Sequence, residues 1–503
     1  MSVITGLLAG FVDVLNPGNF IFVAGGVVLG LVLGAIPGLT ATMAIALMLP
    51  LTANLNSVQA LGMMLAAYNA GTFGGSLSAV LIGTPGTPSA AATVADGYSM
   101  GKRGQAGKAI KCALYSSVFG CLFSTVILVA VAGPISKIAL KFGPSEYSVL
   151  MLFALTIIAS AAGKSLIKGL IGGLVGLTAG CIGMDIGTSF PRLTFGILKL
   201  SSGIDLVVML IGALALSSLF GQVESVRAAQ ARANLAPPTC KDDDIMSKKD
   251  IMTCLPHWLR SSLIGCGIGA LPGLGPALAC YIAYDFGKKF SKTPEAFGTG
   301  SIEGVACAES GNNSVCSAAL IPLLALGVPG DTGAALLMSA FIVQGLTPGP
   351  LIFSESLDTV YGIYASFIIC NIILFIIVML TWKAFRKICS VSVSIILPAV
   401  AIFCVIGSYA FSSTMADIWI MFVFGILGYI LIKFKFPITT TLIGFILSQL
   451  FEKNVRRALS IADGSFATFF RSPICWLFWA ATILSVVLIV RGKMKDENLA
   501  DGL

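Results

Sequence analysis

Charge is scarce in this chain. Only 11% of its 503 residues are Asp, Glu, Lys or Arg, whereas soluble domains carry about 25%. Hydrophobic residues make up 56%, and many apolar stretches reach the roughly 20 residues that a helix needs to span a bilayer. The composition excludes an ordinary soluble domain. It predicts an all-α polytopic membrane protein with roughly 10–12 transmembrane segments.

The side chains of common enzyme and metal sites are also scarce. His257 is the only histidine, and the thirteen cysteines form no C-x-x-C pair. Structural and catalytic zinc sites need several His or Cys ligands, and the chain has no G-x-S-x-G nucleophile motif. We therefore expect neither an enzyme nor a resident cofactor or metal centre, beyond Na⁺ as a coupling ion. The scattered cysteines are more simply buried apolar residues than disulfides.

The net charge of +8 would suit a nucleic-acid partner, but the positions of the charges argue against one. Lys and Arg gather in short loops between apolar runs, for example at residues 101–111 and 224–255. Basic loops of this kind mark the cytoplasmic side of a membrane protein. We expect no nucleic-acid partner.

Pro-Gly pairs interrupt the apolar runs at corresponding places in the two halves. The breaks lie at residues 37–38 and 85–88 in the first half, and at 272–273 and 329–330 in the second. A broken membrane helix leaves backbone groups unpaired unless protein or a watery cavity covers them. Paired breaks in two halves are typical of the binding sites of secondary transporters.

The basic loop changes place between the halves. In the first half it follows the second break (residues 101–111), whereas in the second half it follows the first break (residues 285–292). This predicts an inverted-topology repeat with paired broken or hairpin helices. The predicted units are a first repeat at 1–222, a cytoplasmic linker at 223–255, a second repeat at 256–451 and a C-terminal extra helix and tail at 452–503.

Counting spans places the N-terminus outside and the C-terminus in the cytoplasm. The expected spans after the breaks are 109–133, 145–163, 165–184 and 204–221 in the first half, then 360–382, 391–411, 416–432 and 436–451, with an extra helix at 473–490. One loop disagrees with this count, because residues 452–471 are basic and yet fall outside. Either the count is off by one there or the segment is an interfacial helix.

The breaks supply the candidate binding residues. A restarting helix exposes free N–H groups that bind carboxylates without a buried Arg or Lys, and Thr87 and Ser89 are suited to cap such a restart. The substrate-binding candidates are Asn69, Thr84, Pro85, Gly86, Thr87, Ser89, Asn312, Asn313, Gly330, Asp331 and Thr332.

Carbonyl and hydroxyl oxygens at the breaks also suit a hard monovalent cation such as Na⁺. The cation-binding candidates are Gly38, Thr40, Thr72, Ser76, Gly273, Ser310 and Ser314. Among the acids, Glu303, Glu309 and Asp331 are functional candidates if they lie at membrane depth, whereas Asp96 and Asp285 are interpreted as boundary residues. A carboxylate at depth could serve H⁺ coupling or a cation site, and it would work against binding an anion directly. The alternative is that the Pro-Gly pairs are simple kinks and the small residues serve close helix packing.

The segments 34–39, 68–71, 83–89 and 303–332 resemble the large membrane subunit of the tripartite tricarboxylate transporters, and the resemblance extends over about residues 5–460. It implies a multi-pass permease of the bacterial inner membrane that imports tri- or dicarboxylates such as citrate, usually with Na⁺ in symport. It also implies two partners, a small membrane subunit and a periplasmic binding protein that delivers the ligand. It does not identify the carboxylate.

Three other functions stay open at this point. A passive channel would not accumulate substrate uphill, and a scaffold subunit of a membrane complex would tolerate loss of the polar residues at the breaks. A membrane enzyme acting on lipid or isoprenoid would need an acid–base or metal cluster that the sequence does not contain. A homodimer is among the expected assemblies.

Overall fold

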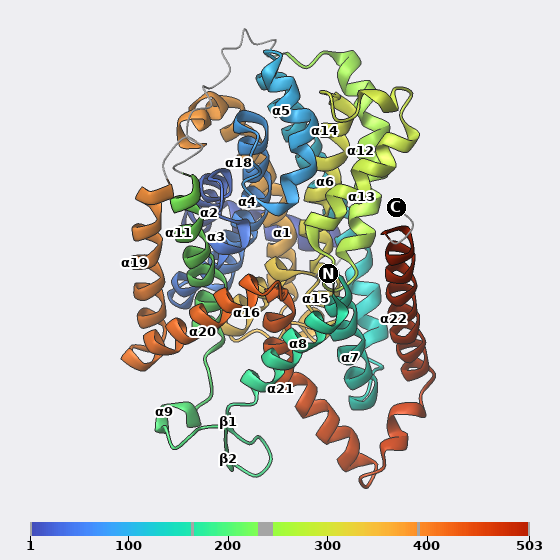
Figure 1. The fold of residues 1–503 in the computed structure, drawn as a ribbon. Helices are drawn as coiled ribbons and strands as arrows, with labels where there is room; N and C mark the ends of the chain where they lie inside the picture. The colour runs from blue at the N-terminus through green and yellow to red at the C-terminus, as the bar shows by residue number, and fades with distance from the viewer. Residues whose placement is uncertain (1–2, 162–164, 230–244, 390–392, 501–503) are drawn as a thin grey trace.

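The computed structural model describes residues 3–161, 165–229, 245–389 and 393–500. Over these ranges the chain is helical, apart from loops and one antiparallel pair of short strands, β1 (Gly183–Met184) and β2 (Pro191–Arg192). By length and composition, 6 helical segments could cross a membrane: Pro17–Ala35, Ser57–Ile82, Ala106–Ala139, Leu206–Glu224, Leu357–Phe385 and Met415–Lys433. The predicted all-α polytopic membrane class is confirmed (Figure 1).

The first half runs from α1 to α11. Its helices are α1 (Val3–Leu15), α2 (Pro17–Ala35), α3 (Ala41–Met48), α4 (Ser57–Ile82), α5 (Ala91–Lys102), α6 (Ala106–Ala139), α7 (Pro144–Ala161), α8 (Leu166–Gly180), α9 (Leu198–Ser201), α10 (Leu206–Leu210) and α11 (Ser217–Ala229). A short 3-10 turn, Pro88–Ala90, leads into α5, and a π-helical segment, Ile211–Leu216, joins α10 to α11.

The second half runs from α12 to α22. Its helices are α12 (Lys248–Gly269), α13 (Gly275–Phe290), α14 (Ile302–Ala318), α15 (Leu320–Leu326), α16 (Thr332–Val343), α17 (Ile352–Glu355), α18 (Leu357–Cys389), α19 (Val393–Ser412), α20 (Met415–Lys433), α21 (Ile438–Ile461) and α22 (Pro473–Ala500). In Figure 1 the β1–β2 ribbon and α9 lie at one end of the molecule, and α5 lies at the other.

Glycines allow the helices around the breaks to pack closely. Gly26, Gly30 and Gly34 follow one another at single-turn spacing on α2 and face the backbone of α4. A Cβ on Gly30 would lie 2.5 Å from the carbonyl oxygen of Ala67. In the second half, Gly265 on α12 meets the backbone of α14 in the same way. Small residues at such spacing are the usual means of close helix contact in membranes.

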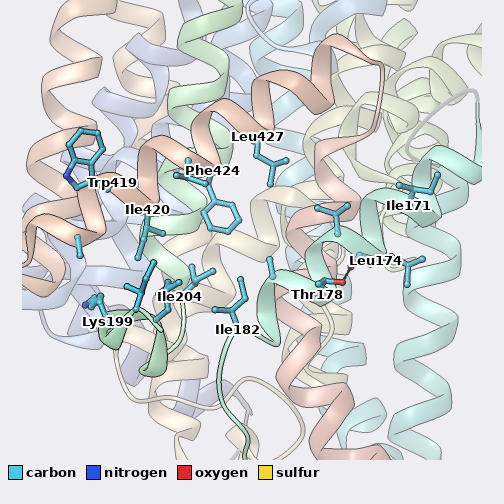
Figure 2. A pocket seen from close by; sticks show the side chains of 16 residues that line it. Ile171, Leu174, Thr178, Ile182, Lys199, Ile204, Trp419, Ile420, Phe424 and Leu427 are labelled. Atoms are coloured by element: carbon cyan, nitrogen blue, oxygen red, sulfur yellow. Dashed lines mark hydrogen bonds between the residues drawn. The ribbon is translucent and has the colours of Figure 1, made fainter. Parts of the chain in front are cut away.

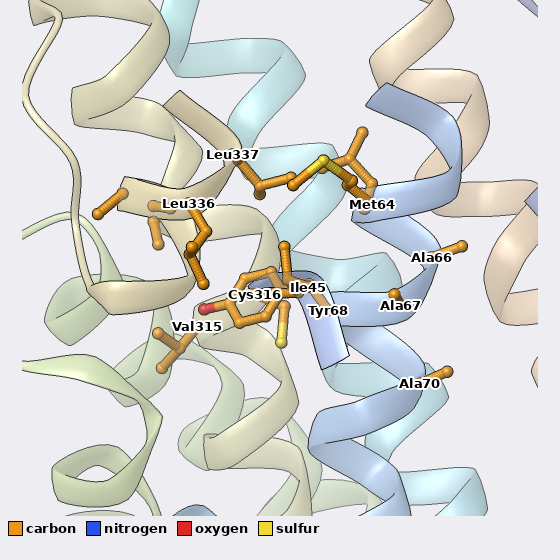
Figure 3. Close-up of a cluster of buried hydrophobic side chains, with 14 of the residues drawn as sticks. Ile45, Met64, Ala66, Ala67, Tyr68, Ala70, Val315, Cys316, Leu336 and Leu337 are labelled. Atoms are coloured by element: carbon orange, nitrogen blue, oxygen red, sulfur yellow. The ribbon is translucent and has the colours of Figure 1, made fainter. Parts of the chain in front are cut away.

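The centre of the molecule is built from both halves. In α4, 94% of the membrane-spanning window is buried, compared with 33% in α6. Figure 3 shows Tyr68 of α4 surrounded by Ile45 of α3, Cys316 of α14 and Leu336 of α16. Because α4 is covered on all sides, its polar residues must find partners inside the protein.

Several expected boundaries are wrong. The span expected at 165–184 ends at Gly180, because the chain turns into the β1–β2 ribbon. The helix expected at 436–451 continues as α21 to Ile461, and the C-terminal helix continues to Ala500. The linker expected at 223–255 overlaps α11 and α12, and its residues 230–244 lie outside the described residues.

Ion pairs explain how α21 continues through charged residues. Asp185, 6% exposed, accepts hydrogen bonds from Gly187 N at 2.9 Å and Thr188 N at 2.8 Å, and pairs with Arg456 at 2.5 Å. Arg192 binds Glu452 through both oxygens, at 2.8 and 3.0 Å. The Thr188 backbone N–H, with help from Arg456, lowers the pKa of the Asp185 carboxyl. These contacts fasten the ribbon to α21.

We predict that Asp185→Asn loosens the ribbon. The amide still accepts from Gly187 and Thr188 but loses the charge that holds Arg456. Limited proteolysis should cut within residues 186–198 several-fold faster than in wild type, and Arg457→Gln, at an exposed neighbouring position, should not change the rate. Because the folded-state pKa is lowered, the wild-type contribution is lost only as pH falls through that lowered pKa. Equal cleavage rates at neutral pH would contradict the prediction.

Candidate functional site

The first break of each half is a tight turn between two helices. In the first half, α2 ends at Ala35 and α3 starts after Thr40, whose Oγ1 accepts a hydrogen bond from Met43 N at 3.2 Å. Gly38 and Gly273 turn the chain with φ of +89° and +88°, a conformation that favours glycine. The expected breaks at 37–38 and 272–273 are therefore present as turns between helices.

The second break of each half ends in a left-handed glycine and then restarts. Gly83 closes α4 with φ of +71°, and Gly327 closes α15 with φ of +72°.

The helices that restart after the second breaks begin differently in the two halves. Asp331 caps α16, because its Oδ1 accepts from Ala334 N at 2.7 Å. Thr87 makes no capping bond; its Oγ1 instead contacts the Ser89 Oγ at 2.8 Å. The expectation that Thr87 and Ser89 cap the restart is wrong for this structure.

Each second break packs against the end of the helix that precedes the first break. Gly86 N donates to Gly75 O at 3.2 Å, and a Cβ on Gly86 would overlap the carbonyl oxygen of Gly34. In the second half, Gly273 N donates to Gly330 O at 2.6 Å. A Cβ on Gly330 would lie 2.7 Å from the carbonyl oxygen of Gly269.

A cavity of about 650 Å³ opens between the breaks. Both halves contribute polar groups to its wall, and Asp331 is the only charged side chain among the lining residues. This absence of Lys and Arg matches an anion site built from backbone and hydroxyl donors. The residues that supply polar groups or close backbone approach are Thr40, Thr42, Tyr68, Thr72, Thr87, Ser89, Gly273, Gly275, Asp331, Thr332 and Thr439.

A hydrogen bond across the two halves fixes one wall of this cavity. The Tyr68 hydroxyl on α4 donates to Asp331 Oδ2 at the start of α16. Nearby, Thr332 Oγ1 donates to Thr439 Oγ1 of α21 at 3.1 Å. The Asp331 carboxylate and the hydroxyls of Thr332 and Thr439 thus place several acceptor oxygens at the second restart. A hard cation prefers oxygen ligands of this kind.

Some predicted site residues lie in the cavity wall and others do not. Thr87, Ser89, Asp331 and Thr332 of the substrate set line the cavity, as do Thr40, Thr72 and Gly273 of the cation set. Four substrate candidates at the second breaks lie outside the lining: Thr84, which is exposed, Pro85, which is half-buried, and the packing glycines Gly86 and Gly330.

The asparagines lie deeper, between helices. Asn69 Nδ2 donates to Asn371 Oδ1 of α18 at 3.1 Å, and Asn313 Nδ2 donates to Ser117 Oγ of α6 at 2.8 Å. Neither amide atom of Asn312 has a partner among the described residues. These three residues are buried outside the cavity wall.

The remaining cation candidates have partners inside the protein. Ser310 and Ser314 bond to carbonyls of their own helix, at 2.7 and 3.0 Å. The Gly38 carbonyl accepts from Gln222 of α11. Ser76 donates to Glu309 Oε1 at 2.6 Å. None of the four lines the cavity.

Sequence reasoning missed Asp96 and Tyr68. Asp96, interpreted as a boundary residue, is 0% exposed, and its Oδ1 accepts from the N–H groups of Gly298, Gly300 and Ser301 at 2.7–2.9 Å. Its other oxygen accepts from the Tyr284 hydroxyl at 2.7 Å. The glycine-rich loop before α14, which supplies these N–H groups, was the available signal in the sequence. Asp96, to which the loop binds, lies in the other half of the chain.

A second, apolar pocket of about 740 Å³ lies between α8 and α20. Figure 2 shows side chains such as Ile171, Leu174, Trp419 and Phe424 around it, with Lys199 at one edge. Thr178 in this pocket bonds to the Leu174 carbonyl of its own helix at 2.8 Å. Such a lining suits hydrocarbon and offers little to a polyanion, so the polar cavity between the breaks is the stronger candidate site.

We predict that Gly86→Ala and Gly330→Ala each displace a break. The added methyl group would press on a backbone carbonyl rather than on a flexible side chain, and overpacking of this kind costs about 1–3 kcal/mol. Both variants should lose thermal stability in detergent. Gly267→Ala is the matched control, because nothing lies within 4 Å of a Cβ there. Unchanged melting temperatures at 86 and 330 would contradict the packing.

Comparison with known proteins agrees with this architecture. The model of the family described as the tripartite tricarboxylate transporter TctA family matches residues 20–443. An Agrobacterium vitis protein, described as an uncharacterized 52.8 kDa protein in the TAR-I ttuC' 3' region, is 36% identical over 499 residues, which is 99% of this chain and 98% of the relative.

A second protein of the same organism, described as an uncharacterized protein in the TAR-II ttuC' 3' region, is 38% identical over 234 residues, or 46% of this chain and 97% of the relative. No solved structure matches the chain. The family match extends over all four breaks and the cavity between them. The chain belongs to the tripartite tricarboxylate transporter TctA family, and is thus a component of a tricarboxylate transporter.

Proposed function

We propose that this chain is a permease that imports tri- or dicarboxylates such as citrate together with a cation, most simply Na⁺, as a secondary active symporter. The observation that carries the proposal is the polar cavity that is lined by residues at a helix restart from each half. Restarting helices present free N–H groups to anions, and irregular backbone presents oxygens to cations.

The two restarts are suited to different ligands. Thr87 and Ser89 leave the first restart without an acidic cap, and their hydroxyl-bearing side chains line the cavity. Pro88 has no N–H, and Ala90 N donates to Thr87 O, so the donors offered here are the hydroxyls and N–H groups of Thr87 and Ser89. Asp331 already occupies the second restart as its cap, and its carboxylate would repel an anion unless a cation lay between them. We therefore assign the anion to the first restart and the cation to the oxygens of Asp331, Thr332 and Thr439.

The remaining parts of the proposal rest on the family. The chain would work in the bacterial inner membrane with a small membrane subunit and a periplasmic protein that delivers the carboxylate, with its N-terminus outside and its C-terminus in the cytoplasm. The inverted repeat and the homodimer stay predictions. In support of the repeat, α2 packs on α4 as α12 packs on α14, and α4 contacts α18 as α14 contacts α6.

Uptake into proteoliposomes tests the transport proposal. Vesicles would contain this chain, its small partner subunit and its cognate binding protein, and a panel of labelled carboxylates would be offered with and without an inward Na⁺ gradient. We expect uphill accumulation of at least one carboxylate that depends on both the gradient and the binding protein. Downhill equilibration alone would favour a passive channel, and no uptake of any carboxylate would favour a scaffold.

Substitutions at the two restarts test the division between anion and cation. Thr87→Val removes a donor to the anion. Since hydrogen bonds to charged groups contribute about 1.5–3 kcal/mol, half-saturation for the carboxylate should rise roughly 10- to 150-fold at unchanged Na⁺ dependence. Asp331→Asn should instead raise the Na⁺ concentration needed for half-maximal uptake.

The matched control is Thr178→Val on α8, which loses only a bond within its own helix and should transport normally. If Thr87→Val changed the Na⁺ requirement and Asp331→Asn changed the carboxylate requirement, the assignment would be reversed. If both variants changed the carboxylate requirement and the Na⁺ requirement equally, the assignment of the two ligands to separate restarts would be wrong.

A further inference from the structure

Glu309 is a carboxylate that the cavity does not use. It lies in the middle of α14 and is 0% exposed. Its Oε1 accepts from Ser76 Oγ of α4 at 2.6 Å and from the Thr93 hydroxyl of α5, and its Oε2 accepts from Ser117 Oγ of α6 at 3.0 Å. Three helices of the first half thus converge on one acid of the second.

This carboxylate has no positively charged partner in the part of the chain that the structure describes. Among the residues that the structure describes, none of the ion pairs includes Glu309. An ionised carboxylate in an apolar interior is very costly without a compensating charge, and such a group normally takes up a proton. The oxygen separations of 2.6 and 3.0 Å are those of O–H···O hydrogen bonds.

The hydroxyls around Glu309 can serve either protonation state. A hydroxyl is both a donor and an acceptor, so Ser117 can donate to the carboxylate or accept from the carboxylic acid. When Ser117 accepts, its own proton needs a new acceptor. Asn313, whose amide already contacts Ser117 at 2.8 Å, carries an Oδ1 atom with no partner among the described residues. The buried network therefore has spare acceptor capacity beside the acid.

Two of the three hydroxyls flank the first-half restart. Ser76 follows Gly75, whose carbonyl oxygen holds Gly86 N at 3.2 Å. Thr93 lies in the first turn of α5, directly after the Pro88–Ala90 turn. Contacts of Glu309 with these two residues therefore bear on the position of the backbone at residues 86–90.

Other titratable groups near Glu309 carry little charge. Glu309 interacts electrostatically with the thiols of Cys112 on α6 and Cys280 on α13, and a thiol is neutral at neutral pH by its ordinary value. Asp96 on α5 is held by three backbone N–H groups and by the Tyr284 hydroxyl of α13. When the two halves are aligned so that Gly86 matches Gly330 and Asn69 matches Asn313, Leu65 is the residue that corresponds to Glu309. The first half therefore has no equivalent of this acid.

We propose that Glu309 is a proton-binding site whose protonation strengthens anion binding at the restart formed by residues 86–90. The proton adds to one carboxylate oxygen and later returns to solvent, and no other covalent bond changes. Loss of the negative charge removes repulsion toward the bound anion, and the rearranged hydroxyls reposition the restart. The coupling to the anion rests on the proposed function, whereas the proton site itself does not.

Infrared difference spectroscopy tests the proton site without any substrate. When the buffer on the purified full-length protein is changed from mildly alkaline to mildly acidic at constant Na⁺, a C=O stretch of a buried carboxylic acid should grow in. Glu309→Gln should remove that band, and Glu295→Gln, at an exposed position, should keep it. A wild-type spectrum equal to that of Glu309→Gln would overturn the proposal. If the C=O band vanished when Na⁺ was added at constant pH, the site would belong to Na⁺, and the proposal of a proton site would also be overturned.

Citrate binding tests the coupling. Wild-type affinity should fall by roughly 5- to 150-fold between mildly acidic and mildly alkaline buffer, the usual range of coupling between two sites. Glu309→Gln, a mimic of the protonated acid, should keep its affinity across that range, and comparison at each pH cancels the titration of citrate itself. If Glu309 had only a structural role, Glu309→Gln would lower the citrate affinity at every pH and would leave the pH dependence of that affinity as in wild type. A protein that binds no carboxylate but shows the band would refute the proposed substrate and the coupling, and would leave the proton site standing.

Discussion

Backbone hydrogen bonding in an apolar surrounding is the constraint on which the rest of this structure depends. A helix broken inside a membrane exposes N–H and C=O groups that lipid cannot satisfy. Here backbone groups at the breaks find partners inside the protein: Gly86 N donates to Gly75 O of α4, and Gly273 N at one break donates to Gly330 O at another. Such contacts require the absence of side chains, because a Cβ at residue 86 or 330 would meet a carbonyl oxygen. The glycines therefore act by allowing contact between backbones, and the residues beside them are left to line the cavity.

The cavity between the breaks is asymmetric. The restarts at two similar breaks differ: the Asp331 carboxylate caps α16, whereas the Thr87 and Ser89 hydroxyls at the other restart bond to each other. Tyr68 ties the carboxylate to the other half of the chain. The anion and the cation of the proposed function would lie side by side in a wall that contains no Lys or Arg. Glu309 provides a second carboxylate, separate from the wall, that touches the elements on either side of the first-half restart.

Much of the fold could be predicted from the sequence, because apolar length and Pro-Gly pairs act locally. The helical membrane class and the positions of the four breaks follow from such signals. The site was predicted less well. Thr87, Ser89, Asp331 and Thr332 lie where the breaks place them, whereas Gly86 and Gly330 pack and Asn312 is buried outside the cavity wall. The contacts of Asp96 and of Tyr68 join residues of opposite halves, and no local pattern marks such pairs. Similarly, α21 continues past its expected end because Arg456 pairs with Asp185 on a distant ribbon.

The most direct test of the central claim is a structure determined with citrate and Na⁺ bound to the complete transporter. The account predicts the carboxylate against residues 86–90 and the cation among the oxygens of Asp331, Thr332 and Thr439, inside the polar cavity between the breaks. Citrate bound elsewhere, for example at the end that carries the β1–β2 ribbon, with the cavity between the breaks filled only by water, would contradict it.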